Sequence, residues 1–216
     1  MIHASTGTKT MFTIALRKLR TFVGEVKSKG FLCESRIVID RAFVAVLANL
    51  FRFPASWHPP TSMRPYRKVV AKTVNALSPN IVCEVGCGLG SILSRLHAPV
   101  RVGYDISPGV IRAARLIRSR SIDFRLGSLE NVDLLKMDVL VLVNWIHEVS
   151  PEELERQLLP LLPKTRFLML DAIDPENTFG YRYKHDFAFL SGRAQRISTS
   201  RHPAEGRSFQ LYQVGA

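Results

Sequence analysis

The feature that most constrains the fold is the alternation of short apolar runs with helix-like segments along residues 81–173. The apolar runs, which have the length and composition of strands, cover 81–85, 100–105, 122–127, 137–145 and 166–173. A continuous apolar run such as 137–145 is typical of a strand that is buried on both faces. The alternation therefore predicts an α/β fold with a mostly parallel sheet.

The segments between these runs carry helix signals. Ser107 is placed as the N-cap of a helix over 107–119, and Ser150 as the N-cap of a helix over 150–162. A proline follows each serine, and proline is favoured in the first turn of a helix. A further helix is expected to start at Ser91.

The tail of the chain, residues 193–214, reads as two strands around a turn near Glu205 and Gly206. A hairpin after alternating strand and helix units adds antiparallel pairing at one edge of the sheet. We therefore expect a Rossmann-like, doubly wound, mostly parallel seven-stranded sheet. It should carry an antiparallel C-terminal hairpin strand and an N-terminal helical appendage.

Two domains are expected along the chain. Residues 1–64 are predicted to form a basic helical appendage that ends in a proline-rich linker, and residues 65–216 the main domain. Within the appendage, helical spacing of apolar residues predicts one helix over 11–26. A second apolar segment, 42–51, is predicted to be a buried or interfacial helix, since it is too short to span a bilayer.

Positive charge gathers in the first third of the chain. The formal net charge is +12, and residues 1–70 hold 12 Lys and Arg against 3 Asp and Glu. This asymmetry favours contact with lipid headgroups, nucleic acid or a charged substrate, although a solvated basic face would need no partner. The helix over 11–26 is open to three interpretations: packing on the main domain, lying on a membrane surface, or an organelle-targeting peptide.

The cysteines indicate a reducing compartment. Cys33, Cys83 and Cys87 are too few and too irregularly spaced for a disulfide framework. No paired histidines and carboxylates recur at ligand spacing, so no metal is expected, and no run is long enough for a transmembrane span. These features predict a cytoplasmic protein, with peripheral membrane contact through the basic N-terminal region as an open alternative.

The stretch CEVGCGLGS, residues 83–91, places three glycines at alternate positions between a predicted strand and a predicted helix. Ligands of doubly wound sheets bind at the carboxyl ends of the strands, where glycines allow a close backbone approach. No lysine follows to make a phosphate-binding P-loop, and a dinucleotide fingerprint would need Gly or Ala in place of Ser91. The pattern acidic-x-G-x-G-x-G is complete, with Glu84, Gly86, Gly88 and Gly90.

The stretch EVGCGLG thereby resembles the first motif of the class I S-adenosylmethionine-dependent methyltransferases, and the resemblance covers about residues 70–175. It implies that S-adenosyl-L-methionine is the cofactor and that this loop, including Cys87, holds its aminoacyl and ribose parts. Glu84 would face the cationic end of the cofactor or a water beside it. Asp105, at the end of the second strand, could accept hydrogen bonds from both ribose hydroxyls, a role that NAD enzymes share.

The resemblance implies further cofactor contacts. Ile106 follows Asp105, and Asn144 ends the fourth strand near the expected cofactor position. The acidic residue that similar enzymes place near the adenine is missing, so backbone groups of Ser128 and an apolar wall from Leu129 are expected there instead.

Methyl transfer to a hydroxyl needs a group that removes its proton. His147 and Glu148 follow the strand that carries Asn144, which makes them the first candidates for a catalytic base. His147 as a pocket-lining residue is the alternative. His185, after the fifth strand, is a second candidate base.

The sequence therefore suggests a methyltransferase that acts on a small-molecule or lipid- or glycan-linked acceptor, at an oxygen. An RNA methyltransferase that uses the basic N-terminal region is the nearest alternative, and an NAD(P)-dependent oxidoreductase or a non-catalytic protein are others. The Asn-Pro-Pro-aromatic motif of many nucleic-acid amino methylases is absent, which makes nucleic acid the less favoured partner.

Overall fold

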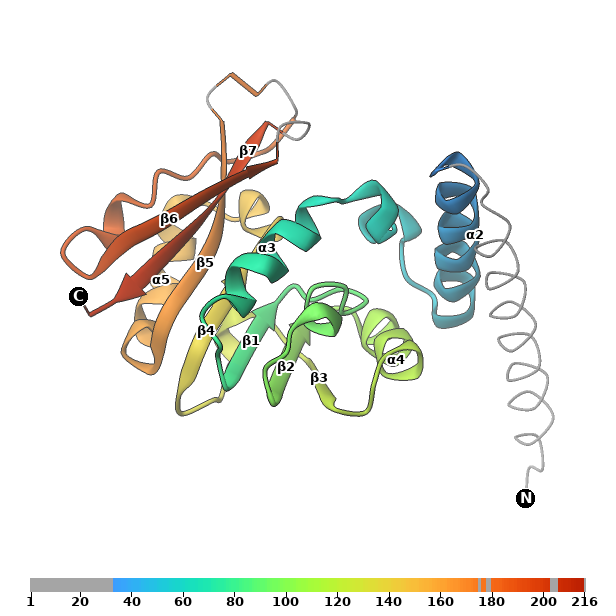
Figure 1. The fold of residues 1–216 in the computed structure, drawn as a ribbon, viewed down its shortest axis with the longest axis horizontal. Coiled ribbons are helices and arrows are strands. Elements are labelled where there is room, and N and C mark those ends of the chain that lie inside the picture. The colour runs from blue at the N-terminus through green and yellow to red at the C-terminus, as the bar shows by residue number, and fades with distance from the viewer. Residues whose placement is uncertain (1–32, 175, 178–179, 203–205, 216) are drawn as a thin grey trace.

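The computed structural model describes residues 33–174, 176–177, 180–202 and 206–215 (Figure 1). The predicted helix over 11–26 and Glu205 of the predicted hairpin turn lie outside these residues. The helices are α2 (Cys33–Phe51), α3 (Tyr66–Asn75), α4 (Pro108–Ile117) and α5 (Pro151–Leu158). The strands are β1 (Ile81–Val85), β2 (Val100–Asp105), β3 (Ile122–Leu126), β4 (Met137–Leu142), β5 (Thr165–Ile173), β6 (Ala194–His202) and β7 (Arg207–Val214).

The strands form one seven-stranded sheet in the order β3-β2-β1-β4-β5-β7-β6. Strands β1 to β5 pair in parallel, and β7 runs antiparallel between β5 and β6. The predicted seven-stranded, mostly parallel sheet with antiparallel C-terminal strands is confirmed. The chain order reverses between β1 and β4, so the carboxyl ends of these strands form the crevice where such sheets bind ligands.

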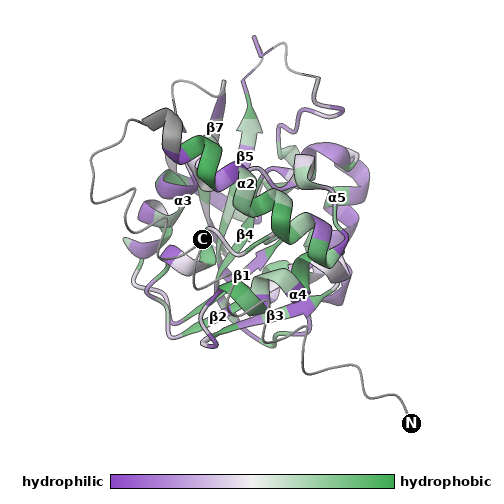
Figure 2. Ribbon diagram, turned by 90° about the vertical axis from the view of Figure 1, so that its right-hand side faces the viewer, coloured by the Kyte–Doolittle hydropathy of each residue, from purple (hydrophilic) through white to green (hydrophobic). Residues whose placement is uncertain are grey.

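Both faces of the sheet are covered by helices. Alternate residues of a strand point to opposite faces, so strands buried on both sides read as continuous apolar runs. On one face, Val82 and Val141 pack in a cluster with Val70 of α3 and Ile111 of α4. On the other face, the core residues are Val85, Leu140, Leu142, Leu168 and Leu170 of the strands with Leu154 and Leu158 of α5. Figure 2 shows hydrophobic residues along the central strands.

Helix α2 packs against α4, beside the main sheet (Figure 1). Val44 and Leu47 are buried in a small cluster with Val110 of α4, whereas Leu50 is 45% exposed. The end of α2 comes so close to α4 that a Cβ on Gly109 would lie 2.3 Å from a carbonyl oxygen of α2. The helix predicted over 42–51 is thus part of a longer helix, one side of which is buried.

The segment after the glycine loop differs from the sequence prediction. The helix predicted from Ser91 is absent, and a single 3-10 turn, η3 (Leu93–Arg95), stands in its place. Leu96 is already extended, and Pro99 disfavours a helical conformation at the residue before it. The loop is therefore not followed by the N-terminus of an α-helix.

The proline-rich segment 54–65 is not fully extended either. It contains two 3-10 turns, η1 (Ala55–Trp57) and η2 (Thr61–Met63), before α3 begins. In the part of the chain that the structure describes, no helix is long and apolar enough to cross a membrane.

Replacing Leu47 by Ala tests whether α2 folds as part of the core. Leu47 is 1% exposed, so its truncation should lower the free energy of unfolding by about 2–5 kcal/mol, measured by urea denaturation. Leu50→Ala on the exposed side of the same helix is the matched control and should cost clearly less. Equal losses in the two variants would contradict the packing of α2 described here.

Candidate functional site

The glycine loop adopts a backbone conformation that requires glycine at each of its three glycine positions. Gly86, Gly88 and Gly90 have φ angles of +70°, +53° and +66°, a region that L side chains rarely adopt. A side chain also lies beside each glycine. A Cβ built on Gly86 would lie 2.2 Å from Trp145 Cδ1, one on Gly88 would lie 3.1 Å from His58 Nδ1, and one on Gly90 would lie 2.6 Å from Phe124 Cζ. The loop is therefore a cradle with exposed backbone and no room for side chains.

Asp105 fixes this loop to the end of β2. Its Oδ2 accepts a hydrogen bond from the Gly88 N–H at 2.9 Å, and its Oδ1 accepts one from the Ser107 N–H at 2.9 Å. A carboxylate offers about four acceptor positions, so two backbone donors leave capacity for further donors. The neighbouring Ile106 is 70% exposed, which places an apolar side chain at the same carboxyl edge.

Glu84 is a buried carboxyl group beneath the loop. It is 5% exposed, it accepts a backbone hydrogen bond from Leu93, and its Oε2 has no partner among the described residues. Burial raises the pKa of Glu84 to about 8, and the nearby guanidinium of Arg67 offsets this only in part. A cationic group of a ligand would stabilise the charged form of this carboxyl group.

Three of the other predicted cofactor residues have structural roles. Ser128 begins the 3-10 turn η4 (Leu129–Asn131), and its N–H and hydroxyl donate to Asn131 Oδ1 at 2.8 and 3.1 Å. Leu129 is 1% exposed and lies in the core, so the predicted apolar wall from Leu129 is wrong because its side chain offers no surface. Cys87 is buried, and its N–H donates to the Tyr104 carbonyl at 2.9 Å.

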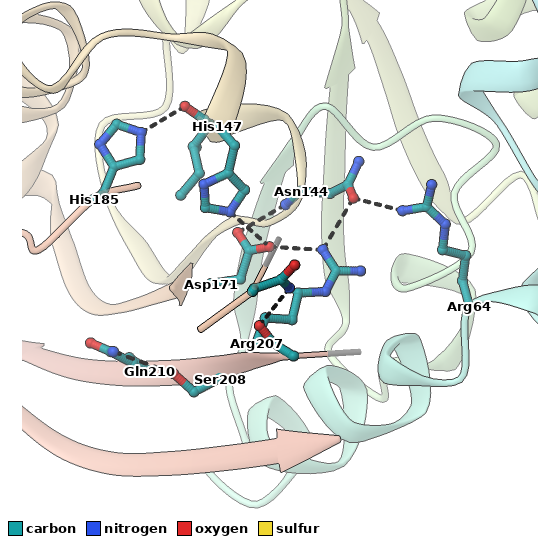
Figure 3. A network of polar contacts seen from close by, with 11 residues as sticks. Arg64, Asn144, His147, Asp171, His185, Arg207, Ser208 and Gln210 are labelled. Carbon is teal, nitrogen blue, oxygen red and sulfur yellow. Dashed lines mark hydrogen bonds and ion pairs between the residues drawn. The ribbon is translucent and has the colours of Figure 1, made fainter. Parts of the chain in front are cut away.

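Asn144 lies at the end of β4 in a conformation that is unusual for a non-glycine residue, with φ +81°. Its N–H donates to Asp171 Oδ1 at 2.9 Å. Its Oδ1 accepts hydrogen bonds from Arg64 at 2.6 Å and from Arg207 at 3.1 Å (Figure 3). Such a backbone costs on the order of 1–3 kcal/mol, so these contacts hold Asn144 in place.

Asp171 and Arg207 form a buried ion pair beneath Asn144. Asp171 is fully buried, and its Oδ2 lies 3.0 Å from Arg207 Nη1. Burial alone would raise the pKa of Asp171, but the contacts with His147 and Arg207 outweigh it and hold this pKa below its usual value. The guanidinium of Arg207 also lies over the ring of Tyr66, 4.1 Å from its centroid.

His147 and His185 are placed differently from the prediction of a catalytic base. His147 is completely buried, and its Nε2 lies 3.2 Å from Asp171 Oδ2. His185 is 6% exposed, and its Nε2 lies 2.8 Å from the Ile146 carbonyl oxygen. In this structure neither ring can reach a substrate, so both histidines support the 3-10 turn η5 (Trp145–Glu148) instead. Glu148 is exposed and stays a predicted catalytic residue.

One residue of this network could have been recognised in the sequence. Asp171 is the one charged residue in the apolar run of β5, FLMLDAI, which marks it as a buried carboxylate in need of partners. Nothing in the sequence distinguishes Arg64 or Arg207 from the other arginines. Among the described residues, no group of three or more His, Cys, Asp or Glu side chains could hold a metal ion.

No protein-family model matches the sequence, and no curated protein matches it. Solved structures do match. Magnesium protoporphyrin IX methyltransferase from Synechocystis PCC 6803 with bound S-adenosylmethionine has a TM-score of 0.57 at 18% identity, over 69% of this chain and 80% of that chain. Its structure with bound S-adenosylhomocysteine gives 0.59 at 18% identity, over 74% and 85%.

Human N-acetylserotonin methyltransferase in complex with S-adenosylmethionine is similar over 92% of this chain and 66% of that chain, with a TM-score of 0.59 and 14% identity. At such identities the likeness concerns the fold. The chain has the fold of the class I S-adenosylmethionine-dependent methyltransferases, as the glycine motif predicted.

Replacing Glu84 by Gln should change how stability depends on pH. The pKa of Glu84 is raised from 4.5 to about 8, so the folded protein keeps a proton that the unfolded chain releases. The wild type therefore loses stability as pH rises from about 5 to 8, by a few kcal/mol at about 1.4 kcal/mol per pKa unit. Gln does not titrate, so the free energy of unfolding of Glu84→Gln, measured by urea denaturation, should rise relative to that of the wild type over this pH range. Glu148→Gln, at an exposed position, should not show this growth, and parallel pH profiles for Glu84→Gln and the wild type would refute the assignment.

Replacing Arg207 by Met should strongly destabilise the protein. The change leaves Asp171 buried without its guanidinium partner, which costs about 3–5 kcal/mol in comparable cases. Thermal or urea unfolding measures the loss. Arg201→Met, at an exposed arginine that is paired with Asp174, is the control and should cost about 1 kcal/mol or less. A loss at Arg207 no larger than at Arg201 would contradict the buried ion pair.

Proposed function

We propose that the protein is a methyltransferase that uses S-adenosyl-L-methionine and methylates an oxygen of a small-molecule or lipid- or glycan-linked acceptor. The observation that carries this proposal is the cradle at the switch point of the sheet. There, Gly86 and Gly88 hold left-handed backbone conformations that keep the loop free of side chains, and Asp105 and Glu84 supply carboxyl groups beside it.

The groups at the cradle fit the chemistry of this cofactor. Asp105 has remaining acceptor capacity for the two ribose hydroxyls, and Glu84, whose Oε2 is buried without a partner among the described residues, would act on the cationic aminoacyl end through its charge or through a water beside it. We expect the exposed side chain of Ile106 to contact the adenine, and Ser128 stays a predicted contact although its N–H donates to Asn131. When bound, the cofactor supplies a methyl group that its sulfonium has already activated.

The absence of an α-helix after the loop favours this cofactor over a dinucleotide. Dinucleotide-binding folds place the pyrophosphate at the N-terminus of the helix that follows the glycine loop. Here the loop leads into turns and η3, a single 3-10 turn. S-Adenosylmethionine carries no pyrophosphate and needs no such helix.

The protein contributes the alignment of the acceptor. In-line methyl transfer requires the acceptor atom to be held at near-attack distance from the methyl carbon. Asn144, at the end of β4, is fixed from three sides by Asp171, Arg207 and Arg64, so the crevice wall that it forms is rigid. His147 acts as a positioning residue through Asp171, and the exposed Glu148 is the remaining candidate for the base.

The proposed acceptor class rests on the names of the similar enzymes. The structures described above are of enzymes named for magnesium protoporphyrin IX and N-acetylserotonin, which are small molecules. Contact of the basic N-terminal region with a membrane surface and a cytoplasmic location remain predictions from the sequence.

Isothermal titration tests the cofactor assignment. S-Adenosylhomocysteine should bind the wild type, and NADH should not. Asp105→Ala removes acceptors for charge-assisted hydrogen bonds that are worth about 1.5–3 kcal/mol each, so the affinity for S-adenosylhomocysteine should fall at least tenfold. Gly88→Val, which forces a side chain into a left-handed backbone against His58, should also abolish binding.

Asp123→Ala is the control. Asp123 is an exposed residue of β3 that forms an ion pair within this strand, and the variant should keep the wild-type affinity. Circular dichroism of each variant separates a loss of binding from a loss of folding. No heat with S-adenosylhomocysteine in the folded wild type would refute the proposed function.

A further inference from the structure

A second pocket, of about 220 Å³, lies between α2, residues 58–60 and the outer side of the glycine loop. Its lining includes four arginines, Arg36, Arg67, Arg95 and Arg118, and one carboxylate, Asp40. These arginines come from α2, α3, η3 and the end of α4, so the fold brings together four positive charges that are distant in sequence. The described side chains that line the pocket therefore carry a large excess of positive charge.

Three of these guanidinium groups converge on one residue, Ser91. Arg118 Nη2 and Arg67 Nη1 lie 3.4 and 3.5 Å from the Ser91 hydroxyl, and Arg95 donates to the Ser91 carbonyl. One neutral hydroxyl at such distances is a weak acceptor for two guanidinium groups. Arg67 and Arg118 each make one shorter contact, to the Pro59 carbonyl at 3.0 Å and to the Leu89 carbonyl at 2.7 Å.

The buried carboxyl group of Glu84 acts electrostatically on Arg67 and Arg118, but its pKa of about 8 leaves it mostly protonated at neutral pH. No ion pair joins Asp40 or another described acidic residue to any of the four. Burial and the neighbouring guanidinium groups lower the pKa of Arg118 to about 10, and they lower the pKa of Arg95 in the same way. Positive charges that are partly desolvated and repel one another are unfavourable, and a bound anion would remove that cost.

We propose that this pocket binds an anion of the phosphate class, either a phosphate ion or the phosphate group of a larger ligand. Guanidinium groups present paired N–H donors that match the oxygens of phosphate, and several such groups facing one cavity form a binding site for a multiply charged anion. The proposal does not depend on the proposed methyltransferase activity.

The pocket is separate from the cradle but adjoins it. His58 lines the pocket, and its Nδ1 lies 3.1 Å from the position of a Cβ on Gly88. The N–H of the same Gly88 is bound by Asp105, which faces the proposed cofactor position. His58 also interacts electrostatically with Asp105, so the pocket borders the proposed cofactor position, and we expect an anion in the pocket to neighbour the cofactor without occupying its place.

Titration of the full chain with sodium phosphate tests the proposal, at ionic strength held constant with sodium chloride. Saturable binding of phosphate is expected, with a rise in the melting temperature that chloride alone does not give. Arg67→Gln should weaken binding about tenfold or more, as expected for a lost charge-assisted hydrogen bond. Arg36→Gln should weaken it about threefold without loss of stability, since Arg36 is exposed and makes no hydrogen bond among the described residues.

Arg120→Gln is the matched control, because Arg120 is an exposed arginine two residues beyond Arg118 and does not line the pocket. It should bind phosphate like the wild type. Glycerol phosphate in place of phosphate distinguishes the two sources of the anion, since tighter binding of the ester points to a larger ligand. Binding no stronger than that of chloride, or an equal loss in Arg120→Gln and Arg67→Gln, overturns the proposal.

A competition experiment checks that the two sites are distinct. S-Adenosylhomocysteine should bind Arg36→Gln within about twofold of its wild-type affinity, and phosphate should not displace it. Mutually exclusive binding would make the arginines part of the cofactor site and overturn a separate anion site. If S-adenosylhomocysteine fails to bind at all, the proposed function fails while the phosphate titration still decides the anion site.

Discussion

The backbone of the glycine loop is the constraint on which the rest of the site depends. Its three glycines have left-handed φ angles, and side chains from η5, from the proline-rich segment and from β3 fill the space beside them. Trp145 contacts Gly86 and also donates from Nε1 to the Val85 carbonyl at 2.7 Å, so it fixes the start of the turn out of β1. The proposed cofactor cradle and the arginine pocket both depend on the position of this one loop.

A buried polar network gives the opposite wall of the crevice its rigidity. Asp171 on β5 binds the backbone of Asn144 after β4 and the guanidinium of Arg207 on β7. The antiparallel strand β7 therefore does more than extend the sheet, because it delivers the cation that neutralises a fully buried carboxylate. These contacts hold a strained backbone in place at Asn144, after the carboxyl end of β4.

The sequence predicted the elements of the fold better than the directions of its side chains. Strand composition, the N-cap at Ser107 and the glycine pattern are local signals, and the structure has strands, a capped helix and a loop at those places. Position along the chain could not show that His147 points inward to Asp171 or that Leu129 points into the core. The arginine pocket could not be predicted from the sequence either, because its four cations meet only after α2, α3 and α4 have packed.

A crystal structure of the protein with S-adenosylhomocysteine would show directly whether the glycine loop holds this cofactor. The ribose hydroxyls should lie within hydrogen-bonding distance of the Asp105 carboxylate and the aminoacyl ammonium near Glu84, with the ligand against Gly86 and Gly88. The ligand should also leave the arginine pocket open. A ligand bound away from Asp105, or with its carboxylate held by Arg67 and Arg118, would contradict the assignment of the two sites.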